Sequence, residues 1–117
     1  MIDDTYERGY GRIVTISSLA ATQGVMGVSA YSAGKGGGIG FMHTLSLETA
    51  RYGVTCNTLT PGIIENMETK GIAPTRPNPV GRFGTGRDVG SAIVWLAAEG
   101  SWVTGQTIGI NGGNPAG

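Results

Sequence analysis

The chain has 117 residues, the size of one domain (1–117) with a modest hydrophobic core. Eight basic and eight acidic residues give a net charge of zero, so no nucleic-acid-binding surface or polybasic membrane anchor is indicated. The single cysteine, Cys56, excludes an internal disulfide bond, and no charged start followed by an apolar run indicates a signal peptide or spanning helix. We therefore expect a cytoplasmic protein whose partners are small molecules or proteins.

The first half of the chain predicts a helical stub, a strand, a long helix and a second strand. Residues 2–8 are predicted to form two turns of helix. Residues 12–16 are an apolar run typical of a strand buried on both faces. Ile39, Met42, Leu45 and Thr49 recur at helical spacing and predict one helix over residues 29–52. Gly53 should end that helix, and residues 54–59 follow as a strand.

Five glycines lie inside the predicted long helix, at positions 34, 36, 37, 38 and 40. Each costs about 0.5–1 kcal/mol relative to alanine in a helix. We expect close packing against another backbone to offset that cost.

After a turn at 61–62, residues 71–86 read as a long loop, residues 87–99 as a helix and residues 107–110 as a third strand. The helix should turn Val89, Ile93, Leu96 and Ala97 inward. The order predicts an α/β fold, a partial Rossmann-like three-layer sandwich with about three parallel strands.

The candidate chemistry is carried by Ser18, Tyr31 and Lys35. Tyr31 and Lys35 are four residues apart near the start of the long helix and so share one helix face. A lysine ammonium there stabilises a tyrosinate, which lets the phenol donate and accept a proton near neutral pH. Ser18 follows the end of a predicted strand, where ligands gather in parallel α/β sheets. Its hydroxyl could hydrogen-bond the substrate oxygen with which Tyr31 exchanges a proton.

Four segments together resemble the short-chain dehydrogenase/reductase family, of the classical type to which the 3-oxoacyl-acyl-carrier-protein reductases belong. They follow one another in the family's order and spacing: residues 11–18 (GRIVTISS), 30–37 (AYSAGKGG), 57–62 (NTLTPG) and 104–113 (TGQTIGINGG). The resemblance runs from about residue 9 to residue 113 and covers the carboxy-terminal half of the family fold.

The resemblance implies an NAD(P)-dependent carbonyl reductase or alcohol dehydrogenase. It assigns Tyr31 as the acid/base, Lys35 as the residue that favours the tyrosinate and binds the nicotinamide ribose, and Ser18 as the hydroxyl that orients the carbonyl. It also implies a cofactor-binding turn with three further members and one altered position. These are Pro61, Gly62 and Ile64, which hold the nicotinamide carboxamide, and Asn66, where many members have a threonine.

The family's glycine-rich phosphate turn and the residue that chooses between NAD and NADP would precede position 1. The amino-terminal dinucleotide-binding half is therefore lacking, and we expect the chain alone to bind NAD or NADP weakly, with an impaired or idle site as one outcome.

Other conspicuous residues have simpler interpretations. Cys56 should be a buried small hydrophobe, and His43 has no partner at metal-ligand spacing, so no metal site is expected. Trp95 and Trp102 suit a core or an interface better than a substrate site. Three arginines, Arg76, Arg82 and Arg87, could meet a cofactor phosphate, although a solvated loop is favoured.

Two other functions stay open. One is a cofactor-independent esterase that uses Ser18 as nucleophile with Tyr31 and Lys35 as base, although no Gly-x-Ser-x-Gly elbow is present. The other is a non-catalytic fragment or assembly module. Whatever the function, we expect an obligate homo-oligomer, a dimer or tetramer. The resemblance implies that the helix at residues 29–52 packs against its copy, and the strand at 12–16 lacks a neighbour.

Overall fold

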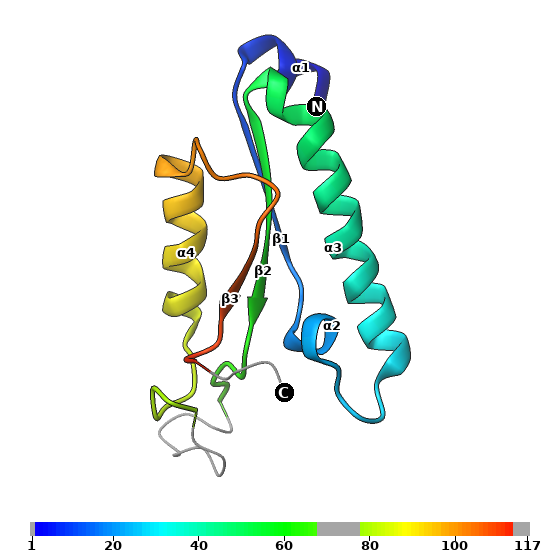
Figure 1. Ribbon diagram of the computed structural model, residues 1–117. Coiled ribbons are helices and arrows are strands. Elements are labelled where there is room, and N and C mark those ends of the chain that lie inside the picture. Colours follow the sequence, from blue (N-terminus) through cyan, green and yellow to red (C-terminus); the bar gives the residue numbers. More distant parts are fainter. Residues whose placement is uncertain (1, 68–77, 114–117) are drawn as a thin grey trace.

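The computed structural model describes residues 2–67 and 78–113. Its centre is a parallel three-stranded sheet in the order β1-β2-β3, formed by Gly11–Ile16 (β1), Val54–Pro61 (β2) and Thr107–Ile110 (β3). Helix α3 (Ser29–Thr49) lies on one side of the strands and α4 (Gly86–Glu99) on the other, which makes three layers (Figure 1). The predicted α/β sandwich with three parallel strands is confirmed.

Three short helices complete the described chain. The predicted stub is α1 (Ile2–Arg8), and the 3₁₀ turn η1 (Ala50–Tyr52) extends α3. Gly53 ends this turn with φ of 75°, a left-handed conformation that favours glycine, as expected. Helix α2 (Leu19–Gln23) was not predicted, because five residues are too short to show a helical period.

A buried apolar cluster lies between α3 and the sheet, and on the other side Leu96 of α4 is buried as well. Every residue of β2 from Val54 to Thr60 is buried, and Met42, Val54 and Cys56 form a buried cluster. Four partly buried side chains pack against this cluster: Tyr6, Ile13, Leu45 and Tyr52. The rings of Tyr6 and Tyr52 stack with centroids 4.1 Å apart, so α1 is tied to the end of α3. Cys56 is buried, as predicted.

The glycines of α3 are not packed against the rest of the described chain. A Cβ atom added at Gly34, Gly37, Gly38 or Gly40 would meet nothing within 4 Å. Gly36 alone has a neighbour, the backbone oxygen of Ala21 at 3.9 Å. Within residues 2–67 and 78–113, no close backbone therefore offsets the cost of four of these glycines.

Three residues singled out in the sequence, Trp95, Trp102 and His43, lie at the surface. Trp95 is 47% exposed and Trp102 is 97% exposed, so neither fills the core; a role at an interface stays a prediction. His43 is exposed, and the described residues contain no group of three or more potential metal ligands. No helix in the described part of the chain is long and apolar enough to cross a membrane.

Candidate functional site

The site predicted from the sequence lies at the carboxyl end of the sheet, where the end of β1, α2 and the start of α3 meet (Figure 1). The amide of Ser17 donates to Leu59 O at 2.7 Å and extends the β1–β2 ladder by one residue. Ser18 then begins α2, which packs against α3. Ligands gather at this edge of parallel α/β sheets, so the local topology favours a binding site here.

Lys35 makes two hydrogen bonds with the end of β1, one through its side chain and one through its backbone. Its ammonium Nζ donates to Ile16 O at 3.3 Å, and its backbone oxygen accepts from Ser17 Oγ at 3.3 Å. The same Nζ lies 5.8 Å from the centre of the Tyr31 ring. The structure therefore brings Lys35, Tyr31 and the end of β1 together, on the helix face that their spacing of four residues predicted.

Ser18 and Tyr31 both have groups available for a ligand. The Ser18 oxygen caps α2 by accepting from the amide of Ala20 at 3.2 Å. This contact uses a lone pair, so the hydroxyl proton can still be donated. Tyr31 is 51% exposed, which leaves its phenol open to solvent and substrate.

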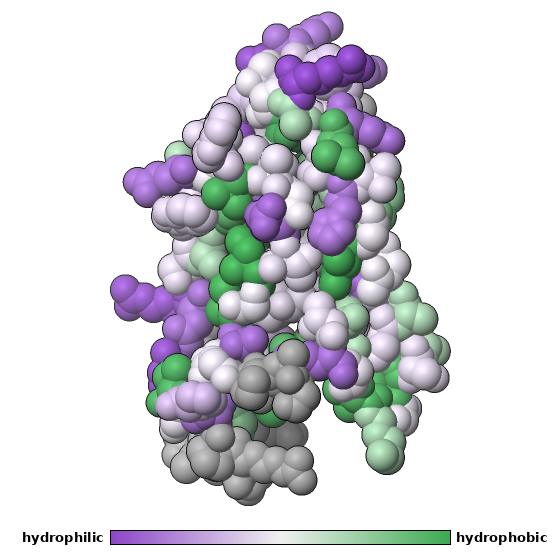
Figure 2. All heavy atoms as spheres, viewed as in Figure 1, coloured by the Kyte–Doolittle hydropathy of each residue, from purple (hydrophilic) through white to green (hydrophobic). Residues whose placement is uncertain are grey.

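An apolar surface borders this end of the molecule. Figure 2 shows apolar and near-neutral side chains over the turn that joins α2 to α3, at the lower right. The exposed apolar side chains of this turn are Val25, Met26 and Val28, with Met26 exposed to 99%. A ligand that reaches Tyr31 along this turn meets apolar surface.

The predicted cofactor-binding turn is held at two points. Pro61 is the last residue of β2, and the amide of Gly62 donates to Ile110 O at 2.9 Å. Ile64 forms an isolated β-bridge with Gly84. Asn66 is exposed. The first part of the turn is thus fixed beside β3 and the second beside the loop that leads into α4, while a cofactor role for these residues stays a prediction.

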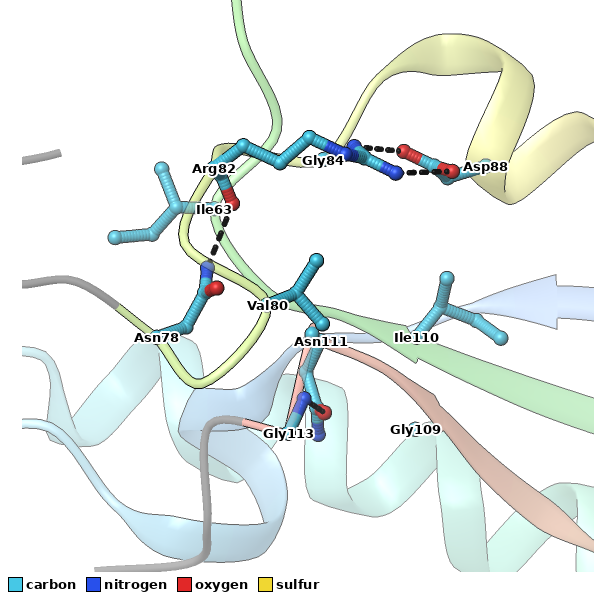
Figure 3. A pocket seen from close by; sticks show the side chains of 11 residues that line it. Ile63, Asn78, Val80, Arg82, Gly84, Asp88, Gly109, Ile110, Asn111 and Gly113 are labelled. Atoms are coloured by element: carbon cyan, nitrogen blue, oxygen red, sulfur yellow. Dashed lines mark hydrogen bonds and ion pairs between the residues drawn. The ribbon is translucent and has the colours of Figure 1, made fainter. Parts of the chain in front are cut away.

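A cavity of about 350 Å³ lies between the end of β3, the segment after β2 and the loop before α4 (Figure 3). On one side Arg82 forms a bidentate pair with Asp88 at 2.7 and 3.1 Å. The hydrogen bond from Arg82 lowers the pKa of Asp88 below its usual range, and the bond to Asp88 raises the pKa of Arg82. Arg82, considered above as a phosphate contact, is therefore already paired with a carboxylate.

The cavity also contains residues that sequence reasoning did not single out. Asn78 donates to Arg82 O at 2.8 Å, and Asn111 Oδ1 accepts from the amide of Gly113 at 3.0 Å. The only sequence signal was the position of Asn111 within the segment 104–113. Arg87 is exposed, whereas Arg76 lies outside the described residues.

The residues present fit one part of a nicotinamide dinucleotide. Tyr31 and the Lys35 ammonium offer hydrogen-bonding groups to a ribose. The amide of Gly62 already donates to Ile110 O, so this donor is not available to a carboxamide. The junction after β1 does not fit the pyrophosphate, because Ser17 and Ser18 stand there and α2 is only five residues long. A glycine-rich turn that opens a longer helix is the usual cradle for that group.

Comparison with known proteins shows which family this chain is similar to. Residues 2–114 match the family model described as Enoyl-(Acyl carrier protein) reductase. A 3-oxoacyl-[acyl-carrier-protein] reductase from Vibrio harveyi is 43% identical over 110 residues, covering 88% of this chain and 45% of the relative. Nodulation protein G from Azospirillum brasilense is 42% identical over 114 residues, covering 92% of this chain and 46% of the relative.

A solved structure shows the same likeness in three dimensions. The crystal structure of a 3-oxoacyl-[acyl-carrier protein] reductase from Brucella melitensis superposes with a TM-score of 0.84 at 32% sequence identity. The match covers 96% of this chain and 45% of that one. The chain therefore spans about half the length of the relatives it matches.

Proposed function

Because this chain belongs to the short-chain dehydrogenase/reductase family, we propose that it forms the proton-transfer half of an NAD(P)-dependent carbonyl reductase or alcohol dehydrogenase. The observation that carries the proposal is the position of Lys35, which joins the end of β1 to the ring of Tyr31. The names of the relatives suggest a 3-oxoacyl substrate, and the apolar surface at residues 25–28 is consistent with an acyl chain.

In this reaction Tyr31 donates its phenolic proton to the substrate oxygen as the carbonyl is reduced, and takes it back in the oxidation direction. Lys35 stabilises the tyrosinate through its positive charge. The Ser18 hydroxyl donates to the same substrate oxygen and orients it. The bound nicotinamide supplies or accepts the hydride.

Cofactor binding is the direct test. NADPH and NADH fluorescence should change with saturation as the chain is titrated. The affinity should be weak, because the junction after β1 does not fit the pyrophosphate. No binding of either cofactor at millimolar concentration would contradict the proposal.

The proton-transfer role of Tyr31 is tested separately. Tyr31→Phe should lower any reductase activity by about 10²–10⁴-fold, because it removes the only proton proposed for transfer. Tyr52→Phe makes the same chemical change at a ring stacked on Tyr6, away from the site, and should leave activity unchanged. Equal activity of the two variants would show that the site is idle.

An assembly role is the second candidate, and the exposed side of α3 favours it. Gly37, Gly38 and Gly40 have open space, and Phe41 on the same helix is 64% exposed. A helix surface of this kind lets a second copy approach closely, as an isologous dimer or tetramer requires. This oligomer could exist with or without catalysis.

Light scattering tests the assembly role. Gly37→Leu should weaken assembly and lower solubility together, whereas Gly86→Leu, at another helical glycine with open space, should not. A monodisperse monomer at micromolar concentration would contradict this second candidate.

No contact in the described part of the chain favours the esterase. Ser18 Oγ accepts from a backbone amide and Lys35 Nζ donates to a backbone carbonyl, so neither described contact joins nucleophile to base. The esterase stays a prediction, and p-nitrophenyl ester hydrolysis that survives Ser18→Ala would exclude Ser18 as its nucleophile.

A further inference from the structure

Two serines follow one another at the carboxyl end of β1, and the site described above uses only Ser18. Ser17 continues the β1–β2 ladder, because its amide donates to Leu59 O at 2.7 Å, and it is 9% exposed. Successive side chains of an extended segment point to opposite faces of a sheet. Ser18 has extended dihedral angles, φ −151° and ψ 154°, so the two hydroxyls point in different directions.

The hydroxyl of Ser17 is directed at α3, where its Oγ donates to the backbone oxygen of Lys35 at 3.3 Å. Lys35 lies inside the helix, so this oxygen also accepts an intrahelical bond from the amide four residues later. A carbonyl oxygen has two lone pairs, and Ser17 takes the second. The bond is therefore not needed to satisfy a buried carbonyl. Its effect is to join the helix to the end of the strand.

The side chain of Lys35 is less suited to hold the helix in place. Its Nζ donates to Ile16 O at 3.3 Å and lies 5.8 Å from the centre of the Tyr31 ring. In the proposed function this ammonium stabilises the tyrosinate and binds a ribose, and its flexible stem lets it move between such partners. The bond from Ser17 goes to the backbone of Lys35, so it stays in place while the ammonium changes partners.

We propose that Ser17 is a positioning residue for proton transfer: its hydroxyl fixes the backbone of Lys35 at the end of β1 and so presents the ammonium to Tyr31. The proposal rests on the proposed function, because it assigns Ser17 a part in the same reaction. Ser17 does not contact the reacting atoms and acts through Lys35.

The start of α3 needs such a contact because its own sequence supports it weakly. The helix begins after Val28 without a side-chain cap, and residues 34, 36, 37 and 38 are glycines. Glycine is among the residues that least favour a helix. The first turns of α3 therefore depend on bonds to neighbouring elements, and Ser17 provides one at the residue that the site needs.

The first test measures the start of α3 directly and does not depend on activity. Ser17→Ala removes the donor and leaves Lys35 O with its intrahelical partner, so the circular dichroism spectrum should match that of the parent. In amide hydrogen exchange, the amides of Lys35, Gly36 and Ile39 should exchange about 2–10-fold faster, as expected for the loss of one hydrogen bond. The amide of Leu45, in the second half of the helix, should keep the rate of the parent.

Ser46→Ala is the matched control. Ser46 is also a buried serine, 3% exposed, and its hydroxyl donates to a backbone oxygen of α3, that of His43, at 2.7 Å. The substitution removes a buried hydroxyl near the other end of the helix and leaves the junction between α3 and β1 intact. Exchange at Lys35, Gly36 and Ile39 should therefore remain as in the parent.

The second test measures the consequence for the reaction. With millimolar NADPH and a 3-oxoacyl thioester as substrate, Ser17→Ala should lower kcat by about 2–10-fold. The KM for the thioester should not change, because the carbonyl is bound by Ser18 and Tyr31 rather than by Ser17. Ser17→Thr keeps the hydroxyl and should restore both kcat and slow exchange, and Ser46→Ala should change neither kcat nor KM.

Ser17→Cys provides a second variant in case threonine does not fit the site. It keeps the size of the side chain but is a weak donor, so in reducing buffer it should resemble Ser17→Ala. Parent-like exchange in Ser17→Ala, or in a folded Ser17→Cys, would overturn the proposal. A folded Ser17→Thr that is no better than the alanine variant would overturn it as well.

Failure of this proposal can be distinguished from failure of the proposed function. A parent chain that reduces no thioester at millimolar NADPH would refute the proposed function, while the exchange of the α3 amides still decides whether Ser17 holds Lys35. Faster exchange in Ser17→Ala with an unchanged kcat would show that Ser17 stabilises the helix without positioning the reaction, and would overturn the proposal.

Discussion

Helices α3 and α4 cover opposite sides of one sheet, yet different interactions hold them in place. α4 begins with a capping box, in which the amide of Asp88 donates to Thr85 Oγ1 at 3.2 Å and the amide of Thr85 donates to Asp88 Oδ2 at 2.8 Å. α3 begins after Val28 without a side-chain cap and contains five glycines. The start of α4 is therefore determined by neighbours in sequence, and that of α3 by tertiary contacts.

This difference bears on the site, because α3 carries Tyr31 and Lys35. The first turns of α3 are held to β1 by two hydrogen bonds, from Ser17 Oγ to Lys35 O and from Lys35 Nζ to Ile16 O. Local stability varies across a protein with such contacts. A helix with weak intrinsic propensity can thus still position the two candidate side chains, Tyr31 and Lys35, when its first turns are attached to a strand end.

The largest expected effect concerns the packing of α3 on the sheet. Met42 is 2% exposed in the core cluster, so Met42→Ala should lower the free energy of unfolding by about 2–5 kcal/mol in urea denaturation. Phe41→Ala, at the exposed neighbouring position, should cost less than about 0.5 kcal/mol. Similar losses from the two variants would show that the core does not position α3.

The cap of α4 should have a smaller effect. Thr85→Ala removes the side-chain acceptor for the amide of Asp88 and should cost about 0.5–2 kcal/mol in thermal or urea unfolding. Thr85→Ser keeps the hydroxyl and should stay close to the parent. If alanine is tolerated as well as serine, the start of α4 is set by packing, and the contrast with α3 fails.

Replacing a glycine of α3 should raise the stability of the fold, whereas the two preceding substitutions lower it. Gly38→Ala should raise stability by about 0.5–1 kcal/mol at low protein concentration, because the added Cβ meets nothing within 4 Å. Gly53→Ala is the control and should destabilise, because its φ is 75° and its Cβ would collide with the backbone of Gly9. A destabilised Gly38→Ala would indicate that a second copy packs there.

The smallest effect is the pH dependence of the Arg82–Asp88 pair. The pKa of Asp88 is lowered in the folded chain, chiefly by the hydrogen bond from Arg82, so the carboxylate binds its proton less readily than when unfolded. Its contribution is present above the ordinary pKa of 3.8 and is lost as the pH falls toward the folded value. The pair is solvent-exposed, which keeps the contribution small.

Thermal melts of the parent and Asp88→Asn measure this dependence. The difference between them should be constant above about pH 5 and shrink as the pH is lowered below about 4. A difference that does not change with pH would show that the charge of Asp88 contributes nothing and that only the capping geometry matters.

The sequence by itself determined the order and type of the main elements and the helix face shared by Tyr31 and Lys35. These features follow from apolar periodicity, from Gly53 and from a spacing of four residues, all of which act over a few neighbouring positions. The motif spacing also identified the family whose fold the comparisons confirm.

Only the tertiary structure decided which distant groups meet. Asn57 accepts from the amide of Gln106 at 3.1 Å and donates to Val103 O at 2.8 Å, and Gly62 is packed against Asn111. The tertiary structure also decided that Lys35 is hydrogen-bonded to β1 and that the glycines of α3 lack close packing. Each depends on how separate elements are oriented in space, and no local pattern of residues encodes that orientation.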